Sequence, residues 1–521
     1  MSDLPAARLW TDRLEHWAQV QPDELCVAYQ EQRWTWAQWR DRVHRLAGAL
    51  ADAGVGRGDR IASLDMNNLS TVELTNAAAL LGAAHVIVNF RLFGDQLAYV
   101  LSDSAPKLLV VGAAFVDNLE AVRAQVPSLE RVVVVGGADD EYQAWVASSE
   151  PVDAAPDVDP EDVVLVMYSS GTTGFPKGVM LSHRAMNAHN EELNLYFRFA
   201  PGITSLSAMP LFHVGGTSYT QVAMHWGAST VLLREVDPVA MFTAIAQGAT
   251  RLFLVPAVVA GVLAGGEGAI KAFAGLTSFA YGASPMPLPL LRKALETWPD
   301  VEFSQVYGMT EFGGVVTALS PEAHRDADHP ERLTSAGTCI GGVEVRVVDP
   351  VSLADVPTGE TGELWFRTAQ IMTGYLGNPQ ATAETITADG WLRTGDLGRM
   401  DDGGFVYVLD RIKDMIVSGG ENVYSPEVEN VIAAHPQVAE VAVFGVPHPV
   451  WVEQVYAVVA PKPGETIDPD EVIAFTRERL AHYKCPKAVE VVDVLPRNAS
   501  GKILRRELRE PYWAGQARRV S

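Results

Sequence analysis

Short apolar runs alternate with longer amphipathic runs from about residue 58 onward. The runs RIASL, HVIVNF, KLLVVG and RVVVVG are typical of buried strands, whereas TVELTNAAALLGAA and GDQLAYVLSDS are typical of helices. Strands that alternate with helices in this way predict a parallel sheet covered on both faces. The same alternation restarts at residue 229, where STVLLRE, RLFLVP and VEFSQVYG are separated by MFTAIAQ and LPLLRKALETW. We therefore predict two α/β layers before residue 310.

The pattern becomes β-rich between about residues 336 and 410, where VEVRVV, GELWFRT and GFVYVLD are separated by Gly and Asp turns. These runs predict a small β subdomain. The residues that follow predict a separate α+β unit, with SPEVENVIAAHP helical and VAEVAVFG and VYAVVAP as strands. A further helix is expected to begin with Asp468 as its N-cap, Pro469 at its first position and Glu471 at its third.

The whole pattern indicates an α/β protein. We expect a large N-terminal domain of two α/β sheet layers plus a small β subdomain, followed by a mobile α+β C-terminal domain. The predicted boundary divides residues 1–412 from residues 413–521, with a hinge near Lys413. Because no Pro- or Ser-rich linker marks this boundary, the connection is expected to be short.

Composition excludes several classes of protein. The 521 residues are 48% hydrophobic and carry a formal charge of −24, so the chain can bury more than one core and is a poor partner for nucleic acid. Its cysteines, Cys26, Cys339 and Cys485, show no metal-binding spacing, which suits a reducing compartment. The N-terminus lacks a signal-peptide pattern, and no apolar run reaches the ~20 residues of a membrane helix. We expect a cytoplasmic protein with no integral membrane segment.

The run YSSGTTGFPKG, residues 168–178, is close to a phosphate-binding P-loop but departs from it. Gly171 and Lys177 have the P-loop separation, whereas Pro176 and Gly178 replace its second glycine and its Mg²⁺-binding hydroxyl residue. We expect the run to lie between a strand and a helix, where backbone N–H groups, hydroxyls and an ammonium can hold a polyphosphate. The alternative is an exposed loop built from turn-forming residues.

The run YGMTE, residues 307–311, can supply the missing metal ligand. Glu311 offers the hard oxygen that Mg²⁺ prefers, Thr310 offers a hydroxyl to a phosphate, and Tyr307 offers a flat face to a base. On its own the run is a weak signal, because a carboxylate at a strand end is often only a helix N-terminal charge. Its combination with the first run strengthens both.

Together these two runs resemble the adenylate-forming superfamily, which includes acyl-CoA synthetases and aryl-CoA ligases, and the resemblance covers nearly the whole chain. Further motifs of the family follow in order: PLFHVGG (210–216), YGASPMP (281–287), GWLRTGD (390–396), DRIKDMIVSGGENVY (410–424) and PRNASGKILRREL (496–508).

The resemblance implies an ATP-dependent acid:CoA ligase. Such an enzyme activates a carboxylic acid as acyl-AMP with release of pyrophosphate and then transfers the acyl group to the CoA thiol, with Mg²⁺ as cofactor. One alternative keeps the adenylation but delivers the acid to a carrier protein, an amine or another nucleophile. Another is a nucleotide-binding regulator descended from such an enzyme. A homodimer and peripheral membrane association are left open.

The resemblance also assigns roles around the nucleotide. Lys502 bridges the carboxylate and the α-phosphate, Thr310 contacts the α-phosphate, and Glu311 helps to hold Mg²⁺. Asp396 accepts hydrogen bonds from the ribose hydroxyls beside Arg411. Without the resemblance, Asp396 would read as a turn residue and Lys502 as solvated surface. The remaining ATP-binding residues are expected to be Ser169, Ser170, Gly171, Thr172, Thr173, Gly174, Lys177, Gly282, Ala283, Ser284, Tyr307 and Gly308.

A third group is expected near the acyl and CoA substrates. His213 would form a wall or gate beside the substrate carboxylate, although a lone histidine in an apolar run is often core. The family's C-terminal domain rotates between half-reactions, and Lys413 matches its pivot. Gly419 and Gly420 would line the pantetheine tunnel, or form a simple tight turn. For the acyl pocket, small residues on one side and larger ones on the other predict a short-to-medium or compact cyclic or aromatic acid; these residues are Gly215, Thr217, Val306 and Phe312.

Overall fold

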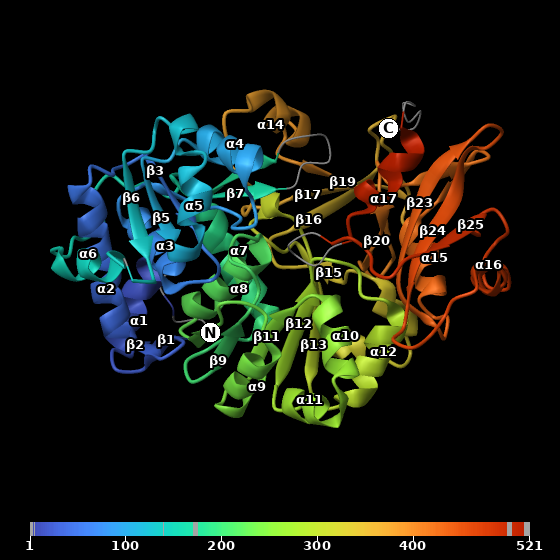
Figure 1. The fold of residues 1–521 in the computed structure, drawn as a ribbon, viewed down its shortest axis with the longest axis horizontal. Coiled ribbons are helices and arrows are strands. Elements are labelled where there is room, and N and C mark those ends of the chain that lie inside the picture. The colour runs from blue at the N-terminus through green and yellow to red at the C-terminus, as the bar shows by residue number, and fades with distance from the viewer. Residues whose placement is uncertain (1–3, 5, 139, 170–175, 498–502, 515–521) are drawn as a thin grey trace.

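The computed structural model describes residues 4, 6–138, 140–169, 176–497 and 503–514. These residues form four sheets, and Figure 1 shows the two large ones side by side, with the C-terminal sheet beyond them. The predicted pair of α/β layers, the small β subdomain and the following α+β unit are all present. The predicted α/β fold class is therefore confirmed.

The seven-stranded sheet has the order β18-β8-β7-β4-β3-β5-β6. Its strands are β3 (Arg60–Leu64), β4 (Ala84–Ile87), β5 (Leu108–Gly112), β6 (Arg131–Val135), β7 (Val163–Ser169), β8 (Lys177–Ser182) and β18 (Gly374–Tyr375). The strands from β7 to β6 run parallel, whereas β8 and β18 are antiparallel additions at one edge.

Helices cover both faces of this sheet. Alternate residues of β5 face opposite cores: Leu108 and Val110 pack with α2 and α3, whereas Leu109 and Val111 pack with α4. Burial on both faces explains why the strands read as continuous apolar runs. The helices associated with this layer are α2 (Trp36–Asp52), α3 (Leu69–Leu80), α4 (Gly94–Ser104), α5 (Val116–Glu120), α6 (Tyr142–Ser148) and α7 (His183–Phe197).

The nine-stranded sheet has the order β15-β14-β13-β12-β11-β9-β10-β1-β2, and its strands from β13 to β1 are parallel. Its strands are β1 (Leu25–Tyr29), β2 (Gln32–Thr35), β9 (Thr204–Ser207), β10 (Ser229–Leu232), β11 (Arg251–Leu254), β12 (Ser278–Gly282), β13 (Glu302–Tyr307), β14 (Thr317–Leu319) and β15 (Thr338–Cys339). The accompanying helices are α1 (Asp12–Val20), α8 (Val214–His225), α9 (Pro238–Ala246), α10 (Pro256–Ala264), α11 (Gly266–Phe273), α12 (Leu288–Thr297) and α13 (Pro321–His324).

The expected strand–loop–helix order around YSSGTTGFPKG is wrong. The run joins two antiparallel strands, since Ser169 of β7 pairs with Lys177 of β8, and helix α7 begins only after β8. Burial of Val179 and Leu181 on one side of β8 favours the strand, and the Ser182 side chain caps α7 by accepting from the Ala185 N–H. The described ends of the run therefore belong to two paired strands, and α7 begins only after the second of them.

The small β subdomain is a four-stranded antiparallel sheet of β16 (Glu344–Val348), β17 (Gly362–Arg367), β19 (Leu392–Met400) and β20 (Val406–Arg411), with α14 (Pro379–Thr385) nearby. The C-terminal unit contains β21 (Ile416–Ser418), β22 (Glu421–Val423), β23 (Val438–His448), β24 (Val452–Pro461) and β25 (Ala488–Val491), with α15 (Ser425–Ile432), α16 (Pro469–Arg477) and α17 (Arg505–Arg509). Asp468 is the N-cap of α16, as predicted. The chain passes from one sheet to the other within residues 412–415.

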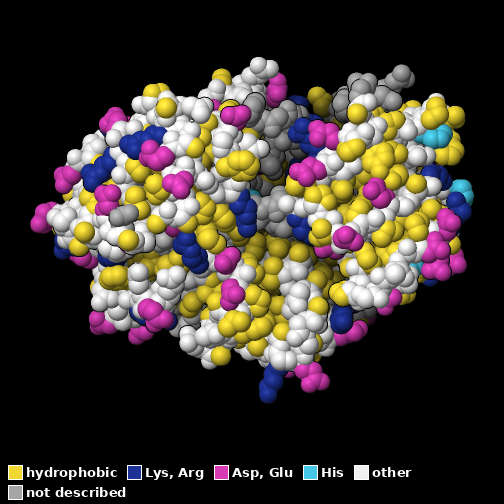
Figure 2. All heavy atoms as spheres, viewed as in Figure 1, with side chains coloured by type: hydrophobic (Ala, Val, Ile, Leu, Met, Phe, Trp, Pro, Cys, Tyr) yellow, Lys and Arg dark blue, Asp and Glu magenta, His cyan; other side chains and the backbone are white. Residues whose placement is uncertain are grey.

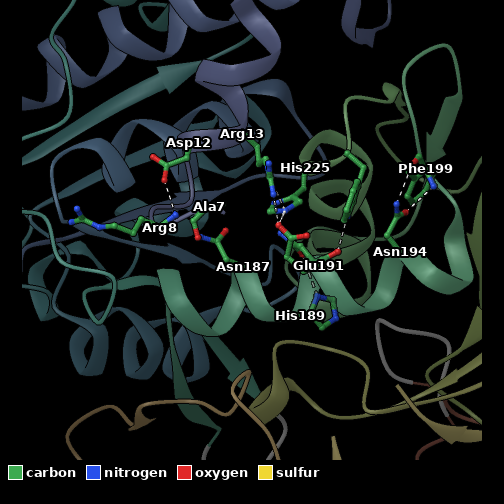
Figure 3. A network of polar contacts seen from close by, with 12 residues as sticks. Ala7, Arg8, Asp12, Arg13, Asn187, His189, Glu191, Asn194, Phe199 and His225 are labelled. Atoms are coloured by element: carbon green, nitrogen blue, oxygen red, sulfur yellow. Dashed lines mark hydrogen bonds and ion pairs between the residues drawn. The ribbon is translucent and has the colours of Figure 1, made fainter. Parts of the chain in front are cut away.

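Hydrogen bonds between polar side chains link helix α1 to helices α7 and α8 (Figure 3). The Arg13 side chain is only 4% exposed and donates hydrogen bonds to Glu191 of α7 and to Nε2 of His225 on α8. Glu191 Oε1 lies 3.0 Å from the same His225 nitrogen. The network ties the N-terminal segment to the helices that run beneath the site described below.

Two expectations drawn from composition can be compared with the structure. Cys26, Cys339 and Cys485 are free thiols. Within the described residues, no helix combines the length and the apolar character needed to cross a membrane.

Candidate active site

Four of the predicted nucleotide residues lie at or just after the ends of β12 and β13: Gly282, Ala283, Tyr307 and Gly308. Ligands of parallel α/β sheets bind at the carboxyl ends of the strands, and both YGASPMP and YGMTE begin there. The space-filling view shows a hollow on this face between the large domain and the C-terminal unit, with Lys and Arg side chains at its rim (Figure 2). The described groups of the site come from the two large sheets and the small β subdomain.

The first cluster surrounds Glu311. This carboxylate lies in a short 3₁₀ turn, Thr310–Phe312, directly after β13, and is only 6% exposed. The Tyr375 hydroxyl donates a hydrogen bond to its Oε1 over 2.9 Å, and the Ser169 hydroxyl lies 3.5 Å from the same oxygen. The Lys177 ammonium lies 4.6 Å from the centre of the Tyr375 ring. The first two motifs are therefore brought together through Tyr375.

This cluster fits a magnesium ion that is shared with a polyphosphate. Mg²⁺ in nucleotide sites takes one or two carboxylates, with phosphate and water oxygens filling its other positions. Glu311 is such a carboxylate, and its Oε2 accepts no hydrogen bond from the described part of the chain. The described residues of the chain contain no group of three or more His, Cys, Asp or Glu side chains that could hold a metal by themselves. The donor set suits a metal that arrives with its nucleotide.

The second cluster joins the nine-stranded sheet to the small β subdomain. The Tyr307 hydroxyl donates to Asp396 Oδ2 over 2.6 Å, and Arg411 Nε lies 3.3 Å from Asp396 Oδ1. Asp396 and Arg411 face each other across β19 and β20. Burial and the Asp396 carboxylate raise the pKa of the Tyr307 hydroxyl, which therefore stays a hydrogen-bond donor. Asp396 is held in one direction by two donors from two sheets.

Small residues at the ends of β12 and β13 let main-chain segments pack closely. Gly282 allows no side chain, because a Cβ there would lie 2.4 Å from the Val306 carbonyl oxygen. Gly308 is equally restricted, since its Cβ would lie 1.9 Å from the Gly314 carbonyl. Ala283 has a φ of 63°, a left-handed conformation that non-glycine residues seldom adopt. Ser284 follows it and is half-buried. Main-chain packing therefore explains both glycines, and their predicted contact with the adenine stays a prediction.

His213 lies at the start of α8. Its ring contacts Phe212, with the ring centres 4.2 Å apart, and its Nε2 is buried without a hydrogen-bond partner among the described residues. Burial, with a smaller effect of nearby Arg91, lowers the pKa of His213 to about 4. The imidazole is therefore neutral near pH 7. An unpaired buried nitrogen at this position can bind a substrate group, which favours the predicted wall or gate over a satisfied core histidine.

The residues predicted for the acyl pocket divide into two groups. Gly215 lies beside Phe253, because a Cβ there would lie 3.1 Å from the ring, and Val306 is largely buried at the end of β13. Phe312 is 0% exposed and packs edge-on against Phe366, and the Thr217 hydroxyl donates to the Leu211 carbonyl. The structure favours core packing for Phe312 and Thr217, and only the other two lie at the strand and helix ends near the site.

The predicted hinge and CoA-side residues lie at the junction with the C-terminal unit. Lys413 is exposed between β20 and β21. Gly419 and Gly420 form the two-residue turn of the β21–β22 hairpin, with φ values of 64° and 90°. Two successive positive φ values require a primed hairpin turn, so both glycines are explained by the turn itself. The Gly419 N–H also donates to the Trp451 carbonyl over 2.9 Å.

Several expected residues lie outside the described part of the chain. These are Ser170, Gly171, Thr172, Thr173 and Gly174 of the first loop, and Lys502. Their roles remain predictions from the resemblance.

Two residues that the sequence did not reveal are Tyr375, which belongs to the first cluster, and Asp410, which lies at the junction with the C-terminal unit. Tyr375 contacts both Glu311 and Lys177, yet it lies in TGYLGNP, where the Gly, Asn and Pro residues indicate only a turn. Asp410 is 5% exposed and accepts hydrogen bonds from the Arg411 and Ser425 N–H groups, each over 2.8 Å. It connects β20 with the start of α15 across the predicted hinge.

Comparison with known proteins agrees with this arrangement. The model for "AMP-binding enzyme" matches residues 14–376, and the model for "AMP-binding enzyme C-terminal domain" matches residues 427–502. A fatty acid–[acyl-carrier-protein] ligase of Streptomyces coeruleorubidus is 36% identical over 97% of this chain and 96% of its own. A feruloyl-CoA synthase of an Amycolatopsis species is 37% identical over 95% and 97%.

Among solved structures, the anthranilate CoA ligase AuaEII in complex with anthranoyl-AMP superposes with a TM-score of 0.89 and 27% identity, covering 98% of both chains. Both relatives and this structure are named as enzymes that join an acid to a thiol. The family models span most of the chain. The chain therefore belongs to the AMP-binding enzyme family of the adenylate-forming superfamily and is an acid–thiol ligase.

Proposed function

We propose that the protein is an ATP-dependent acid:CoA ligase that forms an acyl-adenylate and then an acyl thioester of CoA. The observation that carries this proposal is the pair of neighbouring clusters, with Glu311, Tyr375 and Lys177 beside one another and Asp396 fixed by Tyr307 and Arg411. The first suits a metal-bound polyphosphate and the second suits a ribose. A nucleotide that spanned both would place its α-phosphate between them.

The chemistry needs charge neutralisation more than a nucleophilic side chain. A carboxylate oxygen of the substrate attacks the α-phosphorus of ATP, and the bond from that phosphorus to the bridging oxygen breaks as pyrophosphate leaves. Cations and oriented donors lower the barrier to such a reaction between anions. Lys177 and Arg411 are described cations at the site. Lys502 is the further cation that the family resemblance assigns to this step.

Mg²⁺ would be held by Glu311 and by nucleotide phosphates, and it would supply charge neutralisation to the leaving pyrophosphate. Tyr375 has a supporting part, because its hydroxyl occupies Glu311 Oε1 and so orients the other carboxylate oxygen. His213 would present a neutral imidazole to the acid, and its low pKa makes proton transfer near pH 7 a poor role for it.

Coenzyme A is proposed as the acceptor in the second step. The CoA thiol sulfur attacks the acyl carbonyl carbon, the carbon–oxygen bond to AMP breaks, and the thiol proton is released. The feruloyl-CoA synthase and the anthranilate CoA ligase support this choice. A carrier protein is the second candidate, favoured by the ligase of S. coeruleorubidus.

The acid is proposed to be compact and cyclic or aromatic, or of short-to-medium chain length. Gly215 lies close to the Phe253 ring, since a Cβ there would be only 3.1 Å from it, and Val306 is largely buried at the end of β13. An aromatic ring beside the pocket suits a planar acid more than a long alkyl chain. A cytoplasmic location and a homodimer remain predictions from the sequence.

The test incubates the protein with ATP, Mg²⁺ and a panel of aromatic, cyclic and aliphatic acids, each with CoA, with a holo-acyl-carrier protein, or with neither. We expect acid-dependent AMP and pyrophosphate, and an acyl-CoA in the CoA arm for at least one compact acid. Acyl transfer only to the carrier protein would support the second candidate. Production of ADP, or no pyrophosphate with any acid, would contradict both.

A further inference from the structure

Strand β19 bulges where it carries Asp396. Its partner strand β17 pairs regularly on both sides of Leu364, but Leu364 alone lies opposite residues 394–396. Because three residues of β19 lie opposite one residue of β17, N–H groups of the bulge have no partner in the β17–β19 ladder. Buried N–H groups without partners are costly, so other groups are expected to accept their hydrogen bonds.

Glu363 accepts one of them. The Gly395 N–H donates to Glu363 Oε1 over 2.9 Å, and the indole N–H of Trp365 donates to Oε2 over 2.8 Å. The Glu363 side chain comes from β17 and is largely buried, at 8% exposure. Both carboxylate oxygens are therefore engaged, and the carboxylate has one orientation.

The bulge is held from the other side as well. The Gly395 carbonyl accepts a hydrogen bond from the Ile412 N–H over 2.9 Å, and the Asp396 N–H donates to the Thr394 hydroxyl over 3.0 Å. Gly395 has a φ of 70°, which glycine adopts at no steric cost. Hydrogen bonds to Glu363 and from Ile412 thus hold the backbone before Asp396 on two sides.

We propose that Glu363 is a positioning residue that sets the direction of the Asp396 carboxylate and thereby the preference of the site for ribose hydroxyls. This inference rests on the proposed function, in which Asp396 binds the ribose. Glu363 bonds to the Gly395 N–H, whereas Asp396 meets Tyr307 and Arg411, so Glu363 would act through the backbone and would not touch the nucleotide.

The substitution Glu363→Gln tests the proposal with little change in shape. A carboxamide has one accepting and one donating end, so it cannot accept hydrogen bonds from both Gly395 and Trp365. Glu344→Gln is the matched control, because Glu344 lies on the same sheet and its exposed carboxylate pairs with Arg367 at the protein surface. The measurement is kcat/KM for ATP divided by kcat/KM for 2′,3′-dideoxy-ATP, which lacks both ribose hydroxyls.

We expect Glu363→Gln to lower this ratio by about threefold to tenfold, because a misdirected carboxylate loses part of a charge-assisted hydrogen bond. KM for ATP should rise more than kcat falls, and Glu344→Gln should leave the ratio unchanged. A role in stability alone would weaken both nucleotides equally, so an unchanged ratio in Glu363→Gln would overturn the proposal.

A second variant and a second readout keep the outcome decisive. If Glu363→Gln does not fold, Trp365→Phe removes the donor to Oε2 and retains Gly395; a fall in the ratio supports the proposal and no fall overturns it. The dissociation constants of AMP and 2′,3′-dideoxy-AMP, measured by calorimetry, report the same preference for ribose hydroxyls without turnover. If the parent protein turned over none of the acids, that result would contradict the proposed function. The ratio of AMP binding to 2′,3′-dideoxy-AMP binding would still decide the role of Glu363.

Discussion

Asp396 shows at the scale of single residues how the fold prepares charge for a ligand. Its carboxylate is only 4% exposed, yet Tyr307 and Arg411 each approach a different oxygen. The lone pairs that these donors leave free can accept the vicinal hydroxyls of a ribose. A turn residue with no such role would not need partners from two different sheets, which is why we interpret Asp396 as a ligand-binding group.

Asp396→Asn is expected to lower kcat/KM for ATP by about 10-fold to 100-fold, because hydrogen bonds to a charged acceptor are worth roughly 1.5–3 kcal/mol each. Steady-state pyrophosphate release with varied ATP measures this. Asp355→Asn, an exposed carboxylate paired with Arg346 in the same subdomain, should behave as the parent protein. Equal effects of both substitutions would argue against a ribose-binding role.

His213 makes a prediction about pH. Because burial lowers its pKa to about 4, the imidazole is already neutral at pH 5.5 and stays so to pH 8. The pH profiles of kcat/KM for the acid should therefore have the same shape in the parent protein and in His213→Gln across this range, even if the variant is slower. A limb near pH 6.5 that is present in the parent and absent from the variant would show that His213 titrates in function.

At the scale of elements, the site is made where strands end. Glu311 follows β13, Gly282 ends β12, and Lys177 begins β8, so three neighbouring turns supply its groups. The backbone holds these turns together: the Met372 N–H donates to the Glu311 carbonyl over 2.8 Å, and the Leu376 N–H donates to the Gly178 carbonyl over 2.7 Å. The segment that carries Tyr375 thus joins β8 to the turn that carries Glu311.

The order of the elements could be predicted from the sequence because buried strands and amphipathic helices leave strong periods. The site could be predicted only in part. β18 has two residues and hence no period, so the contact of Tyr375 with Glu311 could not be foreseen. β8 ends at Ser182 and α7 begins at His183 with no turn between them, so the residues of β8 were predicted as the start of the helix. Phe312 was predicted to line the pocket because it follows Glu311 in the sequence. Adjacency in sequence does not determine where a side chain points, and Phe312 packs in the core against Phe366.

The junction of β20 with α15 makes an element-scale prediction. Burial raises the pKa of Asp410 to about 6 from 3.8, against the opposing effects of Arg505 and of its two N–H donors. The folded protein therefore keeps a proton that the unfolded chain has lost, and its free energy of unfolding should fall as the pH rises from about 4 to about 6. Asp410→Asn cannot titrate and should show a smaller fall.

Urea unfolding at pH 4, 5, 6 and 7 measures this difference, with the exposed Asp402→Asn as a control that should follow the parent protein. The other titrating groups are common to all three proteins, so they cancel in the comparison. Parallel curves for the parent and Asp410→Asn would show that the buried carboxylate does not carry the shift.

At the scale of the whole molecule, the C-terminal sheet begins only five residues after β20 ends, at Ile416. Asp410 accepts a hydrogen bond from the Ser425 N–H and so links the end of β20 to the first helix of the C-terminal unit. A short connection of this kind suits a domain that changes its orientation between two half-reactions. In the family that the motifs resemble, this rotation removes the lysine matched by Lys502 and admits the thiol.

Lys502→Ala is therefore expected to reduce acyl-adenylate formation by on the order of 10²-fold to 10³-fold, as for the loss of a charge-stabilising donor. Thioester formation from supplied acyl-AMP and CoA should be nearly unchanged. Single-turnover assays of the two half-reactions measure this separately. If both half-reactions slowed equally, the two-orientation account would be wrong for this protein.

In the proposed reaction the acid attacks the α-phosphorus of ATP, and the attacking oxygen stays with AMP. An acid substrate whose carboxylate is labelled with oxygen-18 can be incubated with ATP, Mg²⁺ and CoA and the label followed by mass spectrometry. We expect label in the phosphate of AMP and none in pyrophosphate. Label in pyrophosphate or inorganic phosphate, or acyl-CoA formed with unlabelled AMP, would contradict the proposed reaction.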